Sequence, residues 1–326
     1  MAATLEQTFH NRRSGVGAPL MGIGHYAGLI DIGGRLALTL HTDGVGTKVL
    51  IAQAMRKYNT VGIDCVAMTV NDLICLGSEP IALLDYLALE RDDGYLVKEV
   101  TKGLVRGAEV AKVPIVGGET AILGEMIKGT GGQGFDLACM GAGIVRKDRV
   151  INGSAIRPGD TIVGLKSSGL HSNGYTLARK ILMARHSLNE PIPSLGRTLG
   201  EELLTPTAIY VHPVLQMLRR VEVHGIAHIT GGAFTKLTRL TERGGLSFRL
   251  EMPDCLPIFT MLSEEAHLSV KEMYCTFNMG IGLCVVLPGD QAEEAMRICR
   301  REGATPTMMG NVTSGNGVFV GKVRLI

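Results

Sequence analysis

Residues 36–55 read LALTLHTDGVGTKVLIAQAM, and this stretch changes its pattern halfway along. The apolar run Leu36–Leu40 predicts a strand, and Val49–Met55 reads as a helix. Between them lies the glycine-containing run TDGVGTK, Thr42–Lys48. Further strands and helices alternate after it, which favours a layered α/β or α+β fold.

The loop Thr42–Lys48 has the chemistry of a phosphate and cation site. Gly44 and Gly46 let backbone N–H groups approach an anion, and the N-terminus of the following helix favours negative charge. Lys48 and Thr47 offer a cation and a hydroxyl, and Asp43 offers an oxygen ligand for Mg²⁺. The spacing is not that of a Walker A loop, and an ordinary Asp-Gly turn is the alternative.

Composition sets broad limits on the function. The chain has 326 residues, 45% of them hydrophobic and 20% charged, which is enough for two domains. The net charge is +2, the basic residues are scattered and there is no Trp, so a nucleic-acid-binding surface is not expected.

Cysteine usage and hydropathy indicate the compartment. The seven cysteines form no Cys-x-x-Cys pair, and most lie in apolar runs, so we expect free buried thiols in a reducing compartment. Met1–Gly15 has no signal-peptide core, and no segment has the length of a membrane span. We therefore expect a cytoplasmic protein with no membrane partner.

Further elements follow from apolar periodicity and from Gly and Pro positions. The polar stretch Arg146–Asp160 predicts a boundary between a domain of residues 1–150 and a domain of residues 151–326. The expected helices are Val61–Leu76, Leu96–Ala111, Tyr175–Met183, Ile209–Arg220 and Phe234–Arg243. The expected strands are Ile81–Leu89, Ile115–Val116, Leu137–Val145, Thr161–Leu165, Ile226–Ile229, Leu246–Leu250 and Ile281–Leu287.

The segment Gly15–Gly34 holds seven glycines and cannot pack as a regular helix. It is either a lid or phosphate-covering loop, or a loosely ordered N-terminal arm.

The helix Val61–Leu76 is almost entirely apolar, yet it carries Asp64, Asn71 and Asp72. At 100° per residue Asn71 returns nearly to the azimuth of Asp64, with Asp72 beside it. Buried carboxylates are costly unless they are paired or bind a metal, so these two are metal candidates or partners of basic residues. Glu119, in the run GGET that follows a short strand, is a further oxygen ligand candidate, although a plain Gly-Gly turn also explains the run.

The run SSGLHSNGY, Ser167–Tyr175, is the densest polar cluster in the chain. Between a strand and a helix it offers an oxyanion cradle, with His171 as a candidate for proton transfer. Helix capping and a structural histidine are the alternatives.

In order along the chain, these segments resemble the phosphoribosylformylglycinamidine cyclo-ligases, the aminoimidazole ribonucleotide synthetases of purine biosynthesis. The matching runs are Thr42–Lys48, Gly62–Leu73, Gly117–Thr120, Ser167–Tyr175, Pro206–Val211, Ala227–Gly232 and Met273–Gly280. The resemblance implies an N-terminal sheet domain that pairs across a homodimer and a C-terminal mixed α/β domain. It also implies ATP-dependent ring closure of formylglycinamidine ribonucleotide to aminoimidazole ribonucleotide, with ADP and phosphate released.

The resemblance also implies roles for residues. Those with a catalytic role are Lys48, Asp72 and His171. Those that bind ATP are Asp43, Gly44, Val45, Gly46, Thr47, Lys48 and Asn71. Those that bind Mg²⁺ are Asp43, Asp64, Asp72 and Glu119. Those that bind the substrate are Ser167, Ser168, Gly169, His171, Ser172, Asn173, Gly231 and Gly232.

Related families fit less well. Selenophosphate synthetases use a reactive Cys or Sec in the first glycine-rich loop, and Gly15–Gly34 has none. Hydrogenase-maturation dehydratases end in a cysteine-bearing tail, thiamine-phosphate kinases lack the Ser167–Tyr175 block, and formylglycinamidine synthetases are much longer. A non-catalytic nucleotide-binding duplicate is the remaining alternative. Cyclo-ligases begin with an additional segment that has no counterpart before Arg12, so we expect a late start or a lineage without it.

Overall fold

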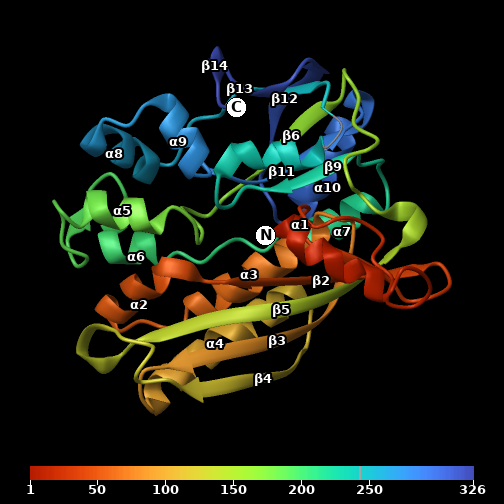
Figure 1. The fold of residues 1–326 in the computed structure, drawn as a ribbon. Helices are drawn as coiled ribbons and strands as arrows, with labels where there is room; N and C mark the ends of the chain where they lie inside the picture. Colours follow the sequence, from red (N-terminus) through yellow and green to blue (C-terminus); the bar gives the residue numbers. More distant parts are fainter. Residues whose placement is uncertain (242–243) are drawn as a thin grey trace.

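The computed structural model describes residues 1–241 and 244–326. The described chain forms two α/β layers, a five-stranded sheet built from the N-terminal half and a seven-stranded sheet built from the C-terminal half (Figure 1). In Figure 1 the first sheet lies below and the second above, and helix α3 runs between them.

The N-terminal sheet has the strand order β1-β2-β5-β3-β4. β3 and β4 are parallel, and the other neighbouring strands are antiparallel. The strands are β1 Gly28–Asp31, β2 Leu36–Gly44, β3 Glu79–Leu89, β4 Ile115–Ile122 and β5 Phe135–Arg146. The helices are α1 Ala2–Leu5, α2 Val49–Met55, α3 Val61–Ile74 and α4 Gly94–Ala111, with short 3₁₀ turns at Glu6–Asn11, Gly46–Lys48, Thr130–Gly132 and Lys147–Arg149.

Helices α3 and α4 approach each other through glycine. A Cβ on Gly62 of α3 would lie 2.3 Å from the Leu104 backbone nitrogen of α4, and one on Gly103 would lie 2.6 Å from the Asn59 carbonyl oxygen. The two backbones are therefore nearly in contact. α3 in turn packs on β2 and β5, and almost all of its residues are buried.

Alternation along the strands divides the N-terminal sheet into two faces. Ala37, Thr39 and Cys139 are buried on the side of α3. On the opposite side, Met140 and Tyr86 remain 40% and 41% exposed. This second face is called the open face below.

The C-terminal sheet is mixed, with the strand order β14-β13-β10-β12-β6-β11-β9, and a separate hairpin pairs β7 with β8. The strands are β6 Thr161–Lys166, β7 Pro191–Ile192, β8 Arg197–Thr198, β9 Gly225–His228, β10 Leu246–Leu250, β11 Ile281–Leu287, β12 Pro306–Ser314, β13 Gly317–Val320 and β14 Val323–Arg324. The helices are α5 Tyr175–Leu182, α6 Leu199–Leu203, α7 Val211–Leu218, α8 Pro257–Ala266, α9 Val270–Thr276 and α10 Ala292–Arg301, with 3₁₀ segments at Ala233–Leu240 and Gly289–Gln291.

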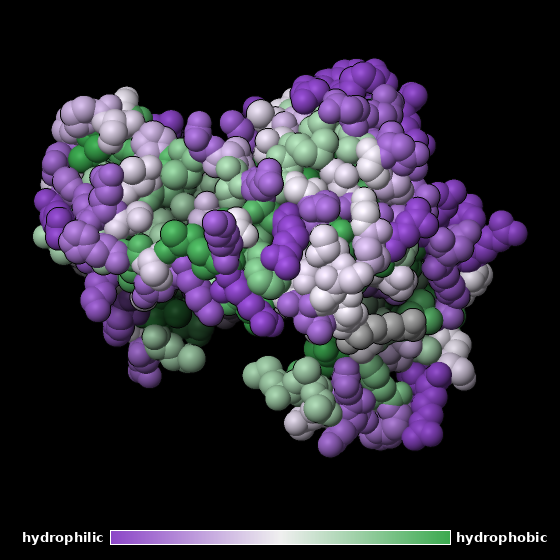
Figure 2. Space-filling view, turned by 90° about the horizontal axis from the view of Figure 1, so that it is seen from above, coloured by the Kyte–Doolittle hydropathy of each residue, from purple (hydrophilic) through white to green (hydrophobic). Residues whose placement is uncertain are grey.

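The surface seen from above carries hydrophilic side chains along most of its rim, with hydrophobic side chains mainly toward the middle (Figure 2). In the part of the chain that the structure describes, no helix combines the length and apolar character needed to cross a bilayer.

Four predicted elements differ from the structure. The strand expected to end at Leu40 continues to Gly44, so the first residues of the predicted loop Thr42–Lys48 belong to β2. The Gly15–Gly34 segment contains strand β1, because Gly28–Asp31 pairs with β2. The run GGET is not a turn but part of β4, where it extends the sheet beside β3. The helix expected over Phe234–Arg243 is a 3₁₀ segment that ends at Leu240, and Glu242 and Arg243 lie outside the described residues. The division after residue 150 stays a prediction.

Candidate functional site

Asp64 and Asn71 of α3 bind the C-terminal half of the chain. Asp64 Oδ1 accepts hydrogen bonds from the Thr207 backbone N–H at 2.7 Å and from its hydroxyl at 2.6 Å. Asn71 donates to the Ala208 carbonyl at 2.8 Å and accepts from the Tyr210 N–H at 2.9 Å. These contacts hold the segment 205–210 against one face of α3. They explain why this otherwise apolar helix carries Asp64 and Asn71.

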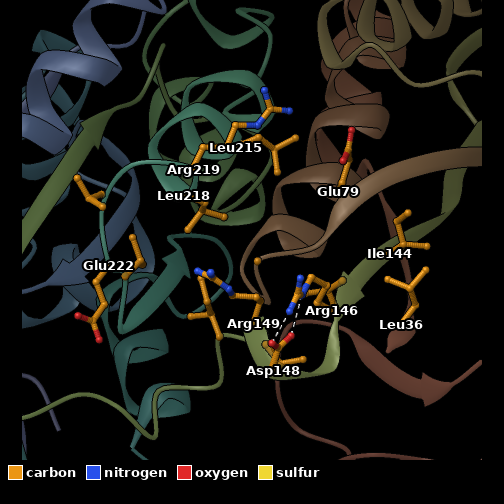
Figure 3. Close-up of a pocket in the computed structure, with 16 residues that line it drawn as sticks. Leu36, Glu79, Ile144, Arg146, Asp148, Arg149, Leu215, Leu218, Arg219 and Glu222 are labelled. Carbon is orange, nitrogen blue, oxygen red and sulfur yellow. Dashed lines mark hydrogen bonds and ion pairs between the residues drawn. The ribbon is translucent and has the colours of Figure 1, made fainter. Parts of the chain in front are cut away.

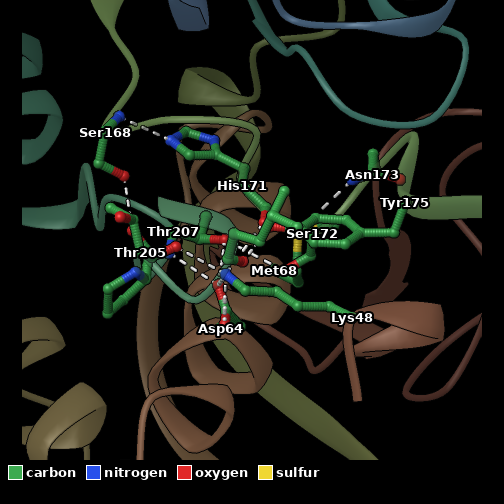
Figure 4. Close-up of polar contacts among 12 residues, drawn as sticks. Lys48, Asp64, Met68, Ser168, His171, Ser172, Asn173, Tyr175, Thr205 and Thr207 are labelled. Carbon is green, nitrogen blue, oxygen red and sulfur yellow. Dashed lines mark hydrogen bonds and ion pairs between the residues drawn. The ribbon is translucent and has the colours of Figure 1, made fainter. Parts of the chain in front are cut away.

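Lys48 belongs to the same interface (Figure 4). Its fully buried ammonium lies 2.8 Å from Asp64 Oδ2, and it donates to the carbonyls of Thr205 at 2.6 Å and His171 at 3.1 Å. Burial lowers the pKa of Lys48, and the neighbouring Asp64 carboxylate opposes that shift. Because the three N–H bonds already have acceptors, Lys48 holds the loop that contains His171 against α3.

The loop after β6 is held from several sides. The Ser167 hydroxyl lies 3.0 Å from both Gly169 O and Asn278 Oδ1. Ser168 Oγ donates to Pro206 O, and Ser172 Oγ lies 3.1 Å from Thr207 Oγ1. Gly169 has φ +158°, and a Cβ there would meet Glu202 Oε1 at 3.5 Å, an ordinary contact distance. The loop is therefore a fixed structure on the 205–207 segment.

His171 is buried and neutral in this environment. Burial lowers its pKa well below the ordinary value, and the charges of His228 and Lys48 act in the same direction. Its Nε2 accepts N–H bonds from Ser168 at 3.2 Å and Ala208 at 3.4 Å, so the ring hydrogen belongs on Nδ1. Among the described residues that Nδ1 has no hydrogen-bond partner.

The glycine pair Gly231 and Gly232 lies close to the loop after β6. A Cβ on Gly231 would lie 3.1 Å from Asn173 Oδ1, and Gly232 has φ +83°, which a residue with a side chain rarely adopts. Asn173 Nδ2 faces Met68 Sδ on α3 at 3.8 Å. The structure thus brings Asn173, Gly231 and Gly232, which are far apart in the sequence, to one place.

The carboxylates of Asp43 and Asp72 meet beside two histidines. His41 Nε2 lies 3.2 Å from Asp72 Oδ2 and 4.0 Å from Asp43 Oδ2, and His228 Nδ1 lies 2.7 Å from Asp72 Oδ1. Burial would lower the pKa of His41, but Asp43 and Asp72 outweigh it and the pKa is raised. Burial would raise the pKa of Asp43, but His41 and the Gly44 N–H outweigh it and the pKa is lowered.

The other two residues predicted to bind metal lie apart from this pair. Asp64 is committed to Lys48 and Thr207. Glu119 is the register partner of Tyr86, whose side chain lies on the open face. Asp43 is the register partner of Cys139, whose side chain lies on the face that α3 covers. Strand alternation therefore places Glu119 and Asp43 on opposite sides of the sheet. In this chain's described part, the metal-ligand cluster is His41, Asp43 and Asp72.

The glycine loop is anchored at both ends. Gly44 N–H donates to its neighbour Asp43 Oδ1 at 2.8 Å, and Val45 N–H donates to Leu137 O at 3.0 Å. Gly46 has φ +69°, and Thr47 Oγ1 lies 3.3 Å from Thr176 Oγ1 of α5. The loop therefore contacts both halves of the chain.

Several residues of this region were missed from the sequence. The Arg239 guanidinium lies 5.1 Å from the ring centre of Tyr26, whose hydroxyl donates to Lys236 O at 3.3 Å. Burial and Arg239 lower the pKa of Lys236, while Asp72 and Asp43 oppose the shift. Burial lowers the pKa of His25 to about 4, with Arg239 acting in the same sense and Asp72 against it. His41 could have been found, because it precedes Asp43 by two residues on a strand.

A cavity of about 760 Å³ lies elsewhere at the junction of the two halves (Figure 3). Apolar side chains such as Leu36 and Leu215 line it together with Arg149, Arg219 and Glu222. None of the residues predicted for the site lines this cavity.

Comparison with known proteins covers nearly the whole chain. Residues 24–145 match the family described as "AIR synthase related protein, N-terminal domain", and residues 157–322 match its C-terminal domain. The chain is 51% identical over 297 residues to the phosphoribosylformylglycinamidine cyclo-ligase of Methanosarcina barkeri, covering 90% of this chain and 86% of that protein. It is 48% identical over 314 residues to that of Thermococcus gammatolerans, covering 96% and 90%.

Solved structures agree on the fold. The thiamine-monophosphate kinase of Stenotrophomonas maltophilia superposes with a TM-score of 0.67 at 19% identity, covering 97% of this chain and 94% of that one. Thermotoga maritima PurL complexed with ADP superposes with a TM-score of 0.61 at 16% identity, covering all of this chain and 48% of that one. At such identities the likeness concerns the fold alone. The cyclo-ligase relatives, at about half identity along both domains, decide the assignment: the chain belongs to the phosphoribosylformylglycinamidine cyclo-ligase family.

Proposed function

We propose that this protein closes the imidazole ring of aminoimidazole ribonucleotide from formylglycinamidine ribonucleotide, using ATP and releasing ADP and phosphate. The single observation that carries this is the 51% identity to a cyclo-ligase across 90% of the chain. The activity is a step of purine biosynthesis.

The reaction needs activation of a poor leaving group. The formyl oxygen attacks the γ-phosphorus of ATP, and the bond from that phosphorus to ADP breaks. The amidine nitrogen then attacks the formyl carbon, the carbon–oxygen bond breaks, phosphate leaves and the nitrogen loses a proton. Such a sequence depends on positioning and on stabilising negative charge more than on a covalent nucleophile.

Asp43 and Asp72 are the proposed metal ligands. Their carboxylates converge with His41, and the donor set fits a divalent cation bound to ATP phosphates. When bound, Mg²⁺ would neutralise charge on the phosphates and draw electrons from the transferred group. His228, hydrogen-bonded to Asp72, would hold that carboxylate in its orientation.

Within the loop of Gly44, Val45, Gly46 and Thr47, the backbone N–H groups of Gly46 and Thr47 are proposed to contact the ATP phosphates, because those of Gly44 and Val45 already donate to Asp43 Oδ1 and Leu137 O. The position of the loop between β2 and α2 and its contact with α5 support this role. Lys48, which has its three donors occupied by protein oxygens, and Asn71, which is bonded to Ala208 and Tyr210, are assigned instead to positioning the 205–210 segment.

The substrate is proposed to lie against the loop of Ser168, His171 and Asn173 and the glycines Gly231 and Gly232. The proximity of Asn173 to Gly231 supports a single binding surface made of both runs. Neutral His171 offers an Nδ1–H donor, and it would therefore stabilise a developing oxyanion or phosphate as a hydrogen-bond donor.

Lys236 and Arg239 give a cationic side to the carboxylate pair. The pKa of Lys236 responds to Asp43 and Asp72, which puts its ammonium within electrostatic reach of them. A negatively charged phosphate between these cations and a carboxylate-bound metal is a favourable arrangement.

A homodimer that pairs through the open face is also part of this proposal. Met140 and Tyr86 leave an apolar surface on a mostly antiparallel sheet with one packed face, and burying such a surface stabilises association. The seven free cysteines fit a reducing cytoplasm, which is the proposed location.

The test measures ADP and aminoimidazole ribonucleotide together. Purified protein is incubated with ATP and Mg²⁺, with or without formylglycinamidine ribonucleotide, and the imidazole product is followed by its colour reaction. Equal amounts of ADP and imidazole product, both dependent on the substrate, are expected. Tight ATP binding without substrate-stimulated ADP release would contradict the proposal and favour a non-catalytic nucleotide-binding protein.

A further inference from the structure

One imidazole nitrogen and two carboxylate oxygens converge where β2 meets α3. His41 and Asp43 are two residues apart on β2, so their side chains leave the same face of the strand. Asp72 reaches this point from α3. One donor atom from each of the three residues lies within 4.8 Å of the others.

The His41 Nε2 atom lies beside two carboxylates without a well-directed hydrogen bond to either of them within the described residues. This nitrogen is buried, and Asp72 Oδ2 is 3.2 Å away from it. A nitrogen that converges with carboxylate oxygens without a directed hydrogen bond to them has the arrangement of a group that shares a cation with those oxygens.

The carboxylate opposite His41 is held in place. Asp72 Oδ1 lies 2.7 Å from Nδ1 of His228, which is completely buried, so Asp72 Oδ2 faces His41. A hydrogen bond from a second residue that orients a ligand is the usual support of a protein metal site.

The spacing already matches that of ligands around one ion. Two neighbouring ligands of an octahedral cation with bonds of about 2.1 Å lie about 3 Å apart. The separation of 3.2 Å from His41 to Asp72 is close to this value, and the separation of 4.0 Å from His41 to Asp43 is close to the roughly 4.2 Å between opposite ligands. A small divalent cation would need little movement of these side chains.

The donor types favour one class of cation. Mg²⁺ selects oxygen ligands and gives up its water reluctantly, whereas imidazole suits first-row transition metals. A site of one imidazole and two carboxylates therefore discriminates in favour of Mn²⁺ and its heavier neighbours. The expectation from the sequence was an all-oxygen site of Asp43, Asp64, Asp72 and Glu119.

We propose that His41 binds the metal ion together with Asp43 and Asp72, and that this site takes a first-row transition cation such as Mn²⁺ more tightly than Mg²⁺. The inference rests on the proposed function in placing the ion beside the ATP phosphates. The imidazole thus determines which metal the site prefers.

The experiment uses pulsed electron paramagnetic resonance of Mn²⁺ added to the full-length protein. Coupling of the Mn²⁺ signal to an imidazole ¹⁴N is expected in the parent protein and in His212→Asn, a control that removes a surface histidine paired with Glu302. The coupling is expected to vanish in His41→Asn. Absence of ¹⁴N coupling in the parent protein, or coupling that persists in His41→Asn, would overturn the proposal.

Affinity gives a second readout. Titration with Mn²⁺ and competition by Mg²⁺ should show Mn²⁺ bound at least about tenfold more tightly, and His41→Asn should remove most of this preference while changing the Mg²⁺ affinity little. Equal affinities for the two ions in the parent protein would contradict the proposal even if the variant did not fold. Formation of the imidazole product with either ion reports on the proposed function separately, because an all-oxygen site would still support it.

Discussion

Lys48 has the sequence context of a phosphate-binding lysine but a structural role in the fold. A lysine that ends a glycine loop predicts a phosphate contact, but its ammonium is buried against Asp64, Thr205 O and His171 O. The cost of burying Asp64 predicted a basic partner, and that alternative describes the observed pair. The identity of the partner could not be predicted, because it depends on how the loop after β2 meets α3.

Replacing Lys48 tests this structural role. Lys48→Met leaves the buried Asp64 carboxylate without its counter-charge, and a loss of about 3–5 kcal/mol in the free energy of unfolding is expected. Lys48→Met with Asp64→Asn removes the unpaired charge and keeps an acceptor for the Thr207 N–H, so it should recover part of the loss. Urea unfolding measures both variants. If Lys48→Met kept its stability and lost affinity for ATP, the structural role would be wrong and Lys48 would be a phosphate-binding residue.

The lowered pKa of His25 predicts that the folded protein loses stability in acid. The pKa of His25 in the folded protein is about 4, below the ordinary 6.5, because it is buried near Arg239. Between these values the unfolded chain binds a proton that the folded chain does not, so stability falls as the pH falls through this window. In His25→Asn the loss between pH 7 and pH 5 should be smaller than in the parent protein by about 2 kcal/mol.

His186 provides the control of opposite sign. Its hydrogen bonds to Glu190 and Glu265 raise its pKa, so its contribution is present below the ordinary value and is lost as pH rises through the folded value. His186→Asn should therefore lower stability at pH 5 more than at pH 8. Urea unfolding across this range checks both variants, and identical pH slopes for His25→Asn and the parent protein would contradict the account.

At the scale of elements, periodicity predicted α2, α3, α4, β3 and β5 nearly to their ends, but it ended β2 at Leu40 although that strand runs to Gly44. It failed where the tertiary context decides, as for β1, whose glycine-rich segment forms a strand only because β2 offers a partner. The same alternation that predicts a strand also separates Glu119 from Asp43. That separation could not be seen until the register across β5 and β3 was known.

The contact of α3 with α4 gives a matched pair of substitutions. Gly62→Ala would put a Cβ 2.3 Å from the Leu104 nitrogen, so the helices must separate, at a cost of at least about 1–3 kcal/mol. Gly94→Ala, at the first residue of α4, meets nothing within 4 Å and should leave stability unchanged or raise it by up to about 1 kcal/mol. Thermal unfolding compares the two, and equal melting temperatures would contradict the close backbone packing.

At the scale of the whole molecule, the candidate site lies where the two halves meet. α3 contributes Asp64, Asn71 and Asp72, and the C-terminal half contributes the 205–210 segment and His228. The sequence indicated two pieces around one ligand site, because both halves carry glycine turns after strands. Some polar residues join the two halves, and others remain available to bind ligands. The division between them depends on how the two halves pack together, which the local sequence pattern does not show.

The proposed dimer is tested by charging the open face. Met140→Arg puts a cation into the centre of an apolar interface and is expected to halve the mass in sedimentation equilibrium. Met308→Arg changes an equally exposed methionine, 45% exposed, on β12 of the other sheet and should leave the dimer intact. A monomeric parent protein, or a Met140→Arg variant that stays dimeric, would contradict pairing through this face.

In the proposed reaction, ATP turns the formyl oxygen into a leaving group at this junction. The most direct measurement follows that oxygen, with substrate labelled with ¹⁸O in the formyl group and the released phosphate analysed by mass spectrometry. One ¹⁸O is expected in each phosphate formed with aminoimidazole ribonucleotide. Unlabelled phosphate, with the label lost to water, would contradict the proposed reaction.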